Sequence, residues 1–262
     1  MDWLEAAFLG GIQGLTEFFP VSSSGHLVMA KEFLGQVEEG IVFEIAVHVG
    51  TMLAILAYYR ERVLELITGT LQRDPVVLAH VGKLALATAP AVLVGLTVKD
   101  AVESMFDHAW IVGVALIVTG ALLLTTRRTV GAATLDVPGW AHALVIGIAQ
   151  VFAITPGISR SGTTVAVALM LGIRAPAATE FSFLMGVIAI AGAAVLALPD
   201  AAAAPVDSLV AYAIGGVVAA VSGFLAIRWF VALLRSQKFH LFAAYCFVAG
   251  AGFLAYLALT RS

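Results

Sequence analysis

Two clusters of polar, helix-breaking residues interrupt apolar stretches of this chain. The first reads GIQGLTEFFPVSSSGHL from Gly11 to Leu27, and the second reads TPGISRSGTT from Thr155 to Thr164. Hydroxyl, carboxylate, imidazole and guanidinium groups are costly at membrane depth, so they survive there only where they face protein or a water-filled cavity. Such groups usually do chemistry or carry a solute. We therefore expect the function of the chain to lie in these two segments.

Serines in both clusters precede predicted helix starts and can cap them. Helix N-termini deep in a membrane present unpaired N–H groups and the positive end of a helix dipole, which bind anions such as phosphate. Arg160 lies beside one of these starts, and its planar guanidinium suits phosphate oxygens. Alternatively, the serines and glycines only satisfy the backbone of a tight turn, but no turn requires Arg160. The residues expected to bind phosphate or diphosphate are Ser22, Ser24, Gly25, Gly157, Ser159, Arg160, Ser161 and Thr163.

Gln13 and Glu17 are four residues apart, so their side-chain oxygens share one face of a helix. A carboxylate beside a diphosphate is suited to hold a hard divalent cation, Mg²⁺ or Ca²⁺, that neutralises phosphate charge. We expect Gln13 and Glu17 to form this metal site. Two alternatives remain open for Glu17: a general base, or a buried acid that pairs with Arg160 for packing.

Ser23 and His26 are three residues apart at the start of the first predicted helix after the break. This spacing puts a hydroxyl and an imidazole within reach of each other, the geometry of a nucleophile and its base. A histidine near a helix start is also often only a satisfied polar residue. The expected catalytic set is Glu17, Ser23, His26 and Arg160.

Further polar residues fall within predicted membrane spans. Glu44 and His48 are one helical turn apart, and Glu180 is the counterpart of Glu44 in the second half of the chain. These side chains either line the same cavity or pair with one another.

The composition indicates how these clusters are positioned. Of 262 residues, 61% are hydrophobic and 12% are charged, against roughly 25% charged in an ordinary soluble domain. The chain is expected to be an all-α, multi-pass membrane protein with no nucleic-acid partner, since it has no basic cluster. Six spans, each near the roughly 20 residues that cross a bilayer, are predicted at 41–60, 82–99, 109–126, 180–199, 209–234 and 240–260.

The two polar clusters belong to an internal repeat. The ten-residue spacing from Gly25 to Gly35 recurs from Gly162 to Gly172, and other spacings follow in the same order. We predict one membrane domain with two halves, about 1–130 and about 131–262. Residues 3–35 and 138–173 fit helical hairpins that enter the membrane and leave on the same side. With one re-entrant hairpin and three spans per half, the second half is inverted relative to the first.

Charge bias predicts the orientation. One side receives most basic residues, and by the positive-inside rule this side is cytoplasmic, which places both termini outside the plasma membrane. The basic residues of that side are Arg60, Arg62, Arg73, Lys83, Arg127, Arg128, Arg174, Arg235 and Lys238. The other side receives Lys31, Lys99 and Arg261. Homo-oligomerisation is left open.

Taken together, the two clusters resemble the signature segments of the undecaprenyl-diphosphatase (bacitracin-resistance) family of membrane phosphatases. The resemblance extends to FEIAVHVGT after the first cluster and ATEFSFLMG after the second. It implies removal of the terminal phosphate from undecaprenyl diphosphate, a lipid substrate, to regenerate the carrier used in cell-wall glycan synthesis.

The resemblance also implies roles for individual residues. Gln13 and Glu17 match the family's Glu/Gln-x-x-x-Glu motif, Ser23 and His26 its proposed nucleophile and partner, and Arg160 its phosphate clamp. Glutamine at position 13 leaves a single carboxylate there, which weakens a two-carboxylate metal model. A polyprenyl-phosphate transporter is the competing interpretation, because it would use the same anion site. It needs no nucleophile, so Ser23 and His26 favour hydrolysis.

Overall fold

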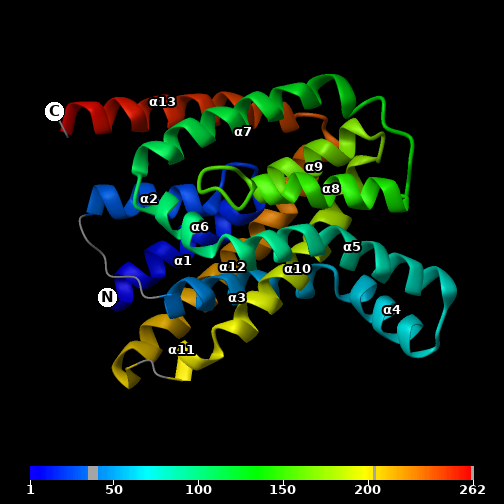
Figure 1. Ribbon diagram of the computed structural model, residues 1–262, viewed down its shortest axis with the longest axis horizontal. Helices are drawn as coiled ribbons and strands as arrows, with labels where there is room; N and C mark the ends of the chain where they lie inside the picture. Colours follow the sequence, from blue (N-terminus) through cyan, green and yellow to red (C-terminus); the bar gives the residue numbers. More distant parts are fainter. Residues whose placement is uncertain (35–40, 203–204, 261–262) are drawn as a thin grey trace.

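The computed structural model describes residues 1–34, 41–202 and 205–260 (Figure 1). The regular structure of this part is helical, and its only β-type pairing is an isolated bridge between Leu135 and Ile173. The helices of the first half are α1 (Trp3–Phe18), α2 (Ser23–Leu34), α3 (Ile41–Tyr58), α4 (Arg60–Leu71), α5 (Pro75–Thr97), α6 (Lys99–Phe106) and α7 (Ala109–Thr129). Those of the second half are α8 (Trp140–Phe152), α9 (Arg160–Met170), α10 (Ala175–Leu196), α11 (Leu198–Ala202), α12 (Val206–Arg235), the 3₁₀ helix η1 (Phe239–Leu241) and α13 (Phe242–Thr260).

Five stretches are long and apolar enough to cross a membrane, and they lie in α5, α7, α10, α12 and α13. A sixth candidate is α3 together with α4, which are bent by 83° at Tyr59. Each of the six predicted spans therefore falls on helical structure, and five of them contain a helix that is long and apolar enough to cross a membrane by itself. α5 begins at Pro75, well before the predicted residue 82, because Asp74 accepts hydrogen bonds from the backbone N–H groups of Val76 and Val77. It also continues through Pro90 without a break.

The two remaining helix pairs form re-entrant hairpins, as predicted. In Figure 1, α1 runs inward from the end of the bundle where the chain begins, and α2 returns to that end. The pair α8 and α9 enters from the opposite end and returns there, so the turns of both hairpins meet near the middle of the molecule. The final residue of the first predicted hairpin, residue 35, lies outside the described residues. The duplication of the halves and their boundaries stay predictions.

The first hairpin is fixed by close contact with α12. A side chain at Gly10 of α1 would clash with the backbone of Gly215, and one at Gly50 of α3 would clash with Gly216. Helices without side chains at the crossing point can approach closely, which is the usual way to pack helices in a membrane. Both α1 and α3 therefore pack against α12, at its neighbouring residues Gly215 and Gly216. This contact positions α1, the helix that carries Gln13 and Glu17.

The ends of the bundle differ in what they carry. α1 begins and α13 ends at one end, whereas α4 and the start of α5 lie at the other (Figure 1). The ends of α7 and α12 and the starts of α8 and α10 lie at the same end as α4. The basic residues assigned by sequence to the cytoplasmic side thus come from segments at one end of the bundle.

Candidate active site

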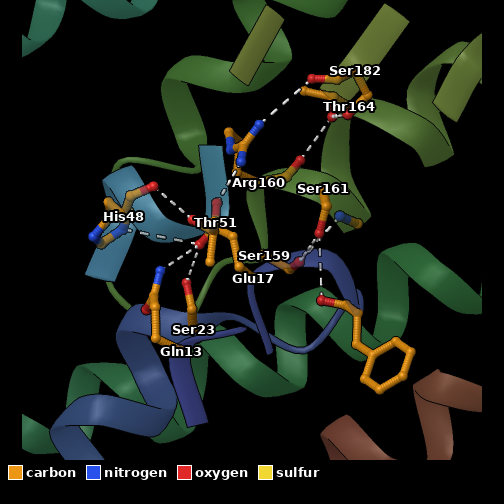
Figure 2. A network of polar contacts seen from close by, with 12 residues as sticks. Gln13, Glu17, Ser23, His48, Thr51, Ser159, Arg160, Ser161, Thr164 and Ser182 are labelled. Carbon is orange, nitrogen blue, oxygen red and sulfur yellow. Dashed lines mark hydrogen bonds and ion pairs between the residues drawn. The ribbon is translucent and has the colours of Figure 1, made fainter. Parts of the chain in front are cut away.

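Glu17, near the end of α1, is the centre of a buried polar network between the two hairpins (Figure 2). The Ser23 hydroxyl donates a hydrogen bond to Glu17 Oε2 at 2.6 Å, and Gln13 Nε2 donates to the same oxygen at 3.0 Å. Glu17 Oε1 pairs with the Arg160 guanidinium, which comes from the other hairpin. The carboxylate is 7% exposed, so its negative charge is compensated by these protein groups rather than by water.

Arg160 is held in place by α10. One guanidinium nitrogen lies 3.5 Å from the Ser182 carbonyl, and the Arg160 carbonyl accepts a hydrogen bond from Thr164, whose hydroxyl is 2.6 Å from that of Ser182. The guanidinium lies directly over Gly186, where any side chain would overlap it. Gly186, Thr164 and Ser182 support Arg160 through contacts that motif spacing alone did not predict.

The turns of the two hairpins are joined through Ser22 and Gly157. Both adopt left-handed backbone, with φ 68° at Ser22 and φ 94° at Gly157. Ser22 Oγ accepts hydrogen bonds from the backbone N–H groups of Gly25 (3.3 Å) and Gly157 (3.2 Å). A Cβ on Gly25 would lie 3.0 Å from the Gly157 Cα, which is tighter than an ordinary contact, and one on Gly157 would overlap the Val112 carbonyl of α7. Ser22 therefore caps its own helix and joins the hairpins at once.

The second hairpin is braced by a residue that sequence reasoning missed. Thr119, fully buried on α7, donates a hydrogen bond to the Gly157 carbonyl at 3.0 Å and accepts one from the Ser159 N–H at 3.2 Å. Ser159 caps α9 by accepting from the Gly162 N–H at 3.0 Å. No motif marks Thr119, because it lies in the middle of an apolar span far along the chain from its partners.

The remaining candidate phosphate-binding residues lie around these turns. The Ser24 hydroxyl is 3.2 Å from that of Ser22, and the Ser161 hydroxyl lies 3.2 Å from that of Ser159 and donates to the Phe19 carbonyl at 3.4 Å. The Thr163 hydroxyl is buried and has no hydrogen-bond partner in the described part of the chain. The N-termini of α2 and α9 thus lie close to each other, next to Arg160.

His26 does not contact Ser23 in the way that their spacing predicts. Its Nδ1 lies 2.8 Å from the Ser22 carbonyl, and its Nε2 lies 2.7 Å from the hydroxyl of Tyr245 on α13. A carbonyl oxygen only accepts, so Nδ1 carries a hydrogen, and in the neutral ring Nε2 accepts from Tyr245. Ser23 and His26 therefore do not form a hydrogen-bonded pair here, and their roles as nucleophile and base stay predictions. Helix geometry turns the imidazole toward α13, and Ser23 bonds to Glu17 instead.

The other intramembrane polar residues divide between the site and the ends of the bundle. His48 Nε2 lies 3.9 Å from Glu17 Oε2, so His48 lines the site (Figure 2). Glu44 pairs with Lys31 at 3.2 Å, and Glu180 pairs with Arg62 at 2.9 Å. The two glutamates that the repeat relates thus each bind a basic residue outside the polar network.

The protein oxygens at Glu17 and Gln13 are suited to hold a divalent cation only if substrate phosphates supply further ligands. Within the described ranges, no group of three or more His, Cys, Asp or Glu side chains could hold a metal ion. Gln13 Oε1, however, is buried and has no hydrogen-bond partner among the described residues, while Nε2 of the same amide donates to Glu17. Mg²⁺ is commonly held by one or two carboxylates, several waters and substrate phosphates. One carboxylate and one amide oxygen supply the protein's share of such a set.

Taken together, the described helices and the buried network define a multi-span membrane protein with a polar site where two re-entrant hairpins meet. The family model of bacitracin resistance protein BacA matches residues 6–252, and the chain belongs to this family. An undecaprenyl-diphosphatase of Alcanivorax borkumensis is 38% identical over 272 residues, covering 98% of this chain and 100% of that protein. That of Syntrophotalea carbinolica is 38% identical over 97% of this chain and 99% of its own length. That of Desulfatibacillum aliphaticivorans is 37% identical over 96% and 97%.

Replacing Gly186 by alanine tests the placement of Arg160. The added methyl overlaps the end of a flexible side chain, so the fold should persist while the guanidinium moves. Turnover of a lipid diphosphate should fall on the order of 10²-fold, as expected for displacement of a positioning group by about 1 Å. Gly192→Ala, on the same helix with open space around it, is the matched control and should keep wild-type turnover. Equal rates for the two variants would contradict this role of Gly186.

Arg160→Lys should be nearly as damaging as Arg160→Ala, with a loss on the order of 10²-fold in turnover. A lysine ammonium cannot bridge Glu17 and the Ser182 carbonyl with a planar fork. Arg174→Lys serves as the control, because Arg174 pairs with Asp136 at an exposed position. Recovery of most activity by lysine at position 160 would mean that only the positive charge matters there.

Proposed function

We propose that this chain is a membrane phosphatase that hydrolyses undecaprenyl diphosphate to undecaprenyl monophosphate and inorganic phosphate. Family membership supports the activity, and so do the undecaprenyl-diphosphatases that match this chain over nearly their whole length. The proposed location is the plasma membrane, and the proposed role is recycling of the lipid carrier for cell-wall glycan synthesis.

The observation that carries the proposal is the contact between Ser23 and Glu17. A hydroxyl that donates to a buried carboxylate at 2.6 Å has a proton acceptor already in position. Arg160, on the other side of the same carboxylate, is suited to bind phosphate oxygens. A transporter would need the anion site but not the hydroxyl–carboxylate pair, so this contact favours hydrolysis.

In the covalent route, Ser23 Oγ attacks the terminal phosphorus of the diphosphate. The bond between that phosphorus and the bridging oxygen breaks, undecaprenyl monophosphate leaves, and Glu17 accepts the serine proton. Water then attacks the phosphoserine and releases inorganic phosphate. In the alternative route, Glu17 takes a proton from water, and that water attacks the terminal phosphorus directly.

The ion pair between Glu17 and Arg160 suggests how substrate starts either route. Without substrate, the two charges neutralise each other in a site that largely excludes water. A diphosphate between the N-termini of α2 and α9 would compete for the guanidinium, because phosphate oxygens accept the same bidentate hydrogen bonds. Glu17 would then be free to accept a proton.

A divalent cation, Mg²⁺ or Ca²⁺, is proposed to bind with the substrate at Glu17 and Gln13. When bound, it would neutralise diphosphate charge that a single arginine leaves uncompensated. Gln13 Oε1 supports this position, because it is buried and accepts no hydrogen bond from the part of the chain that the structure describes.

The proposed orientation places both termini outside the cell. It is supported by the position of the basic residues, which come from helix ends at the end of the bundle opposite the start of α1 (Figure 1). The first hairpin would then open to the outside and the second to the cytoplasm.

Ser23→Ala is the decisive variant. Turnover should be abolished, while lipid diphosphate binding stays close to wild type, because the hydroxyl acts mainly in the transition state. Ser236→Ala is a suitable control, since that hydroxyl bonds only the Leu233 carbonyl at an exposed helix end. A rate above roughly a tenth of wild type would assign the attack to water.

Rapid-quench experiments with labelled substrate separate the two routes. The covalent route predicts labelled phosphate on the peptide that contains Ser23, whereas direct attack by water leaves the protein unlabelled. If Ser23→Ala loses turnover but the wild-type protein carries no labelled phosphate, the role of Ser23 is to orient the attacking water.

Removal of metal tests the cation. Exhaustive chelation should suppress turnover, and Mg²⁺ or Ca²⁺ should restore it, because a low dielectric strengthens repulsion between diphosphate charges and the attacking oxygen. A matched sample that receives the chelator already saturated with Ca²⁺ controls for direct effects of the reagent. Full activity after chelation would remove the cation from the mechanism.

A further inference from the structure

A polar cavity lies at the end of the bundle where α3 bends into α4. Its volume is about 570 Å³, and it lies between the bend and α12. The bend supplies Tyr58, Tyr59, Arg60 and Glu61, and α12 supplies Phe224 and Arg228. We call it the bend cavity. None of its lining residues belongs to the candidate active site.

The charges around the bend cavity are unevenly compensated. Arg62 is bound by Glu65 at 2.7 Å and by Glu180 at 2.9 Å, so its charge is neutralised within the protein. Arg60 and Arg228 are exposed, and neither forms a hydrogen bond or ion pair with any residue that the structure describes. Among the described lining residues, the carboxylates are Glu61 and Glu65. Arg60, Arg62 and Arg228 thus stand against Glu61, Glu65 and Glu180 around the cavity. Because two of the three glutamates converge on Arg62, the guanidinium groups of Arg60 and Arg228 are left as unoccupied donors for an anion.

The position of α4 connects this cavity to the membrane surface. α3 packs lengthwise along α12, and α4 turns by 83° from it at the end of the bundle (Figure 1). If α3 crosses the bilayer, a turn of this size lays α4 nearly along its surface. Leu64, Ile67 and Leu71 lie on one face of α4 and are 59%, 52% and 78% exposed. An apolar face on a short surface helix is typical of helices that contact lipid chains.

The aromatic residues of this region fit the same depth. Tyr58 and Tyr59 line the cavity, and Trp229, next to Arg228 on α12, is 56% exposed. Tyrosine and tryptophan are enriched where hydrocarbon meets the lipid headgroups. The arginines of the cavity suit the phosphate of a phospholipid headgroup, and the exposed apolar face of α4 beside them suits its acyl chains.

We propose that the bend cavity binds the headgroup of an anionic phospholipid of the bilayer. Its phosphate lies between Arg60 and Arg228, and its acyl chains follow the exposed face of α4. Basic pockets between membrane helices bind such headgroups through charge-assisted hydrogen bonds. The site is distinct from the diphosphate site and does not depend on the proposed hydrolysis.

Native mass spectrometry of the purified protein in detergent tests the proposal. Wild type should keep bound phosphatidylglycerol at collision energies that remove phosphatidylcholine. The double variant Arg60→Gln/Arg228→Gln should retain less phosphatidylglycerol, by a factor of roughly ten or more, because two charge-assisted contacts are lost. Arg127→Gln/Arg128→Gln is the matched control, since it removes the same charge from the end of α7 at the same end of the bundle. It should bind phosphatidylglycerol as wild type does.

Further arms make each outcome decisive. Glu61→Gln removes a carboxylate that lines the cavity and should increase binding of phosphatidylglycerol, which keeps the proposal testable if the double variant fails to fold. Equal losses in both arginine pairs would show a general charge effect and overturn the site. Equal retention of phosphatidylcholine would exclude recognition of an anionic headgroup. Displacement of the lipid by millimolar inorganic phosphate alone would assign the cavity to a soluble anion instead.

Discussion

The buried ion pair between Glu17 and Arg160 is the interaction on which the rest of the site depends. Taking a carboxylate and a guanidinium out of water is costly, and only good geometry with further hydrogen bonds offsets that cost. Ser23 and Gln13 supply those bonds to Glu17, and the Ser182 carbonyl supplies one to Arg160. Loss of either charge would leave the other buried and unpaired. The pair thus fixes the two hairpins at one separation.

The helices around the hairpins make this pairing attainable. Glycine contacts bring α12 against α1 and α3, so the face of α1 that carries Glu17 points inward. Thr119 on α7 braces the second turn, and Ser22 joins both turns through the Gly157 N–H. The hydrogen bonds of Thr119 and Ser22 satisfy backbone groups that hydrocarbon could not satisfy. The same broken backbone that would be costly in lipid therefore creates the cluster of helix N-termini suited to an anion.

One helix links the two regions of interest. α10 contacts Arg160 through the Ser182 carbonyl and Gly186, and it binds Arg62 beside the bend cavity through Glu180. Glu180 and Ser182 are two residues apart on α10, so their side chains point in different directions from the helix axis. α10 thus contacts residues of both the candidate active site and the bend cavity.

The sequence by itself determined the class of protein, the six spans, both hairpins and most polar residues of the site. These follow from local properties: apolar runs of membrane length, breaks at proline and glycine, and residues that hydrocarbon does not tolerate. Only the tertiary structure decided which side chains meet. Spacing paired Ser23 with His26, whereas the fold gives Ser23 to Glu17 and His26 to Tyr245, 219 residues away. Thr119 and Gly186 act through contacts between distant helices. Helical periodicity specifies the face on which a residue lies, but not the helix that packs against that face.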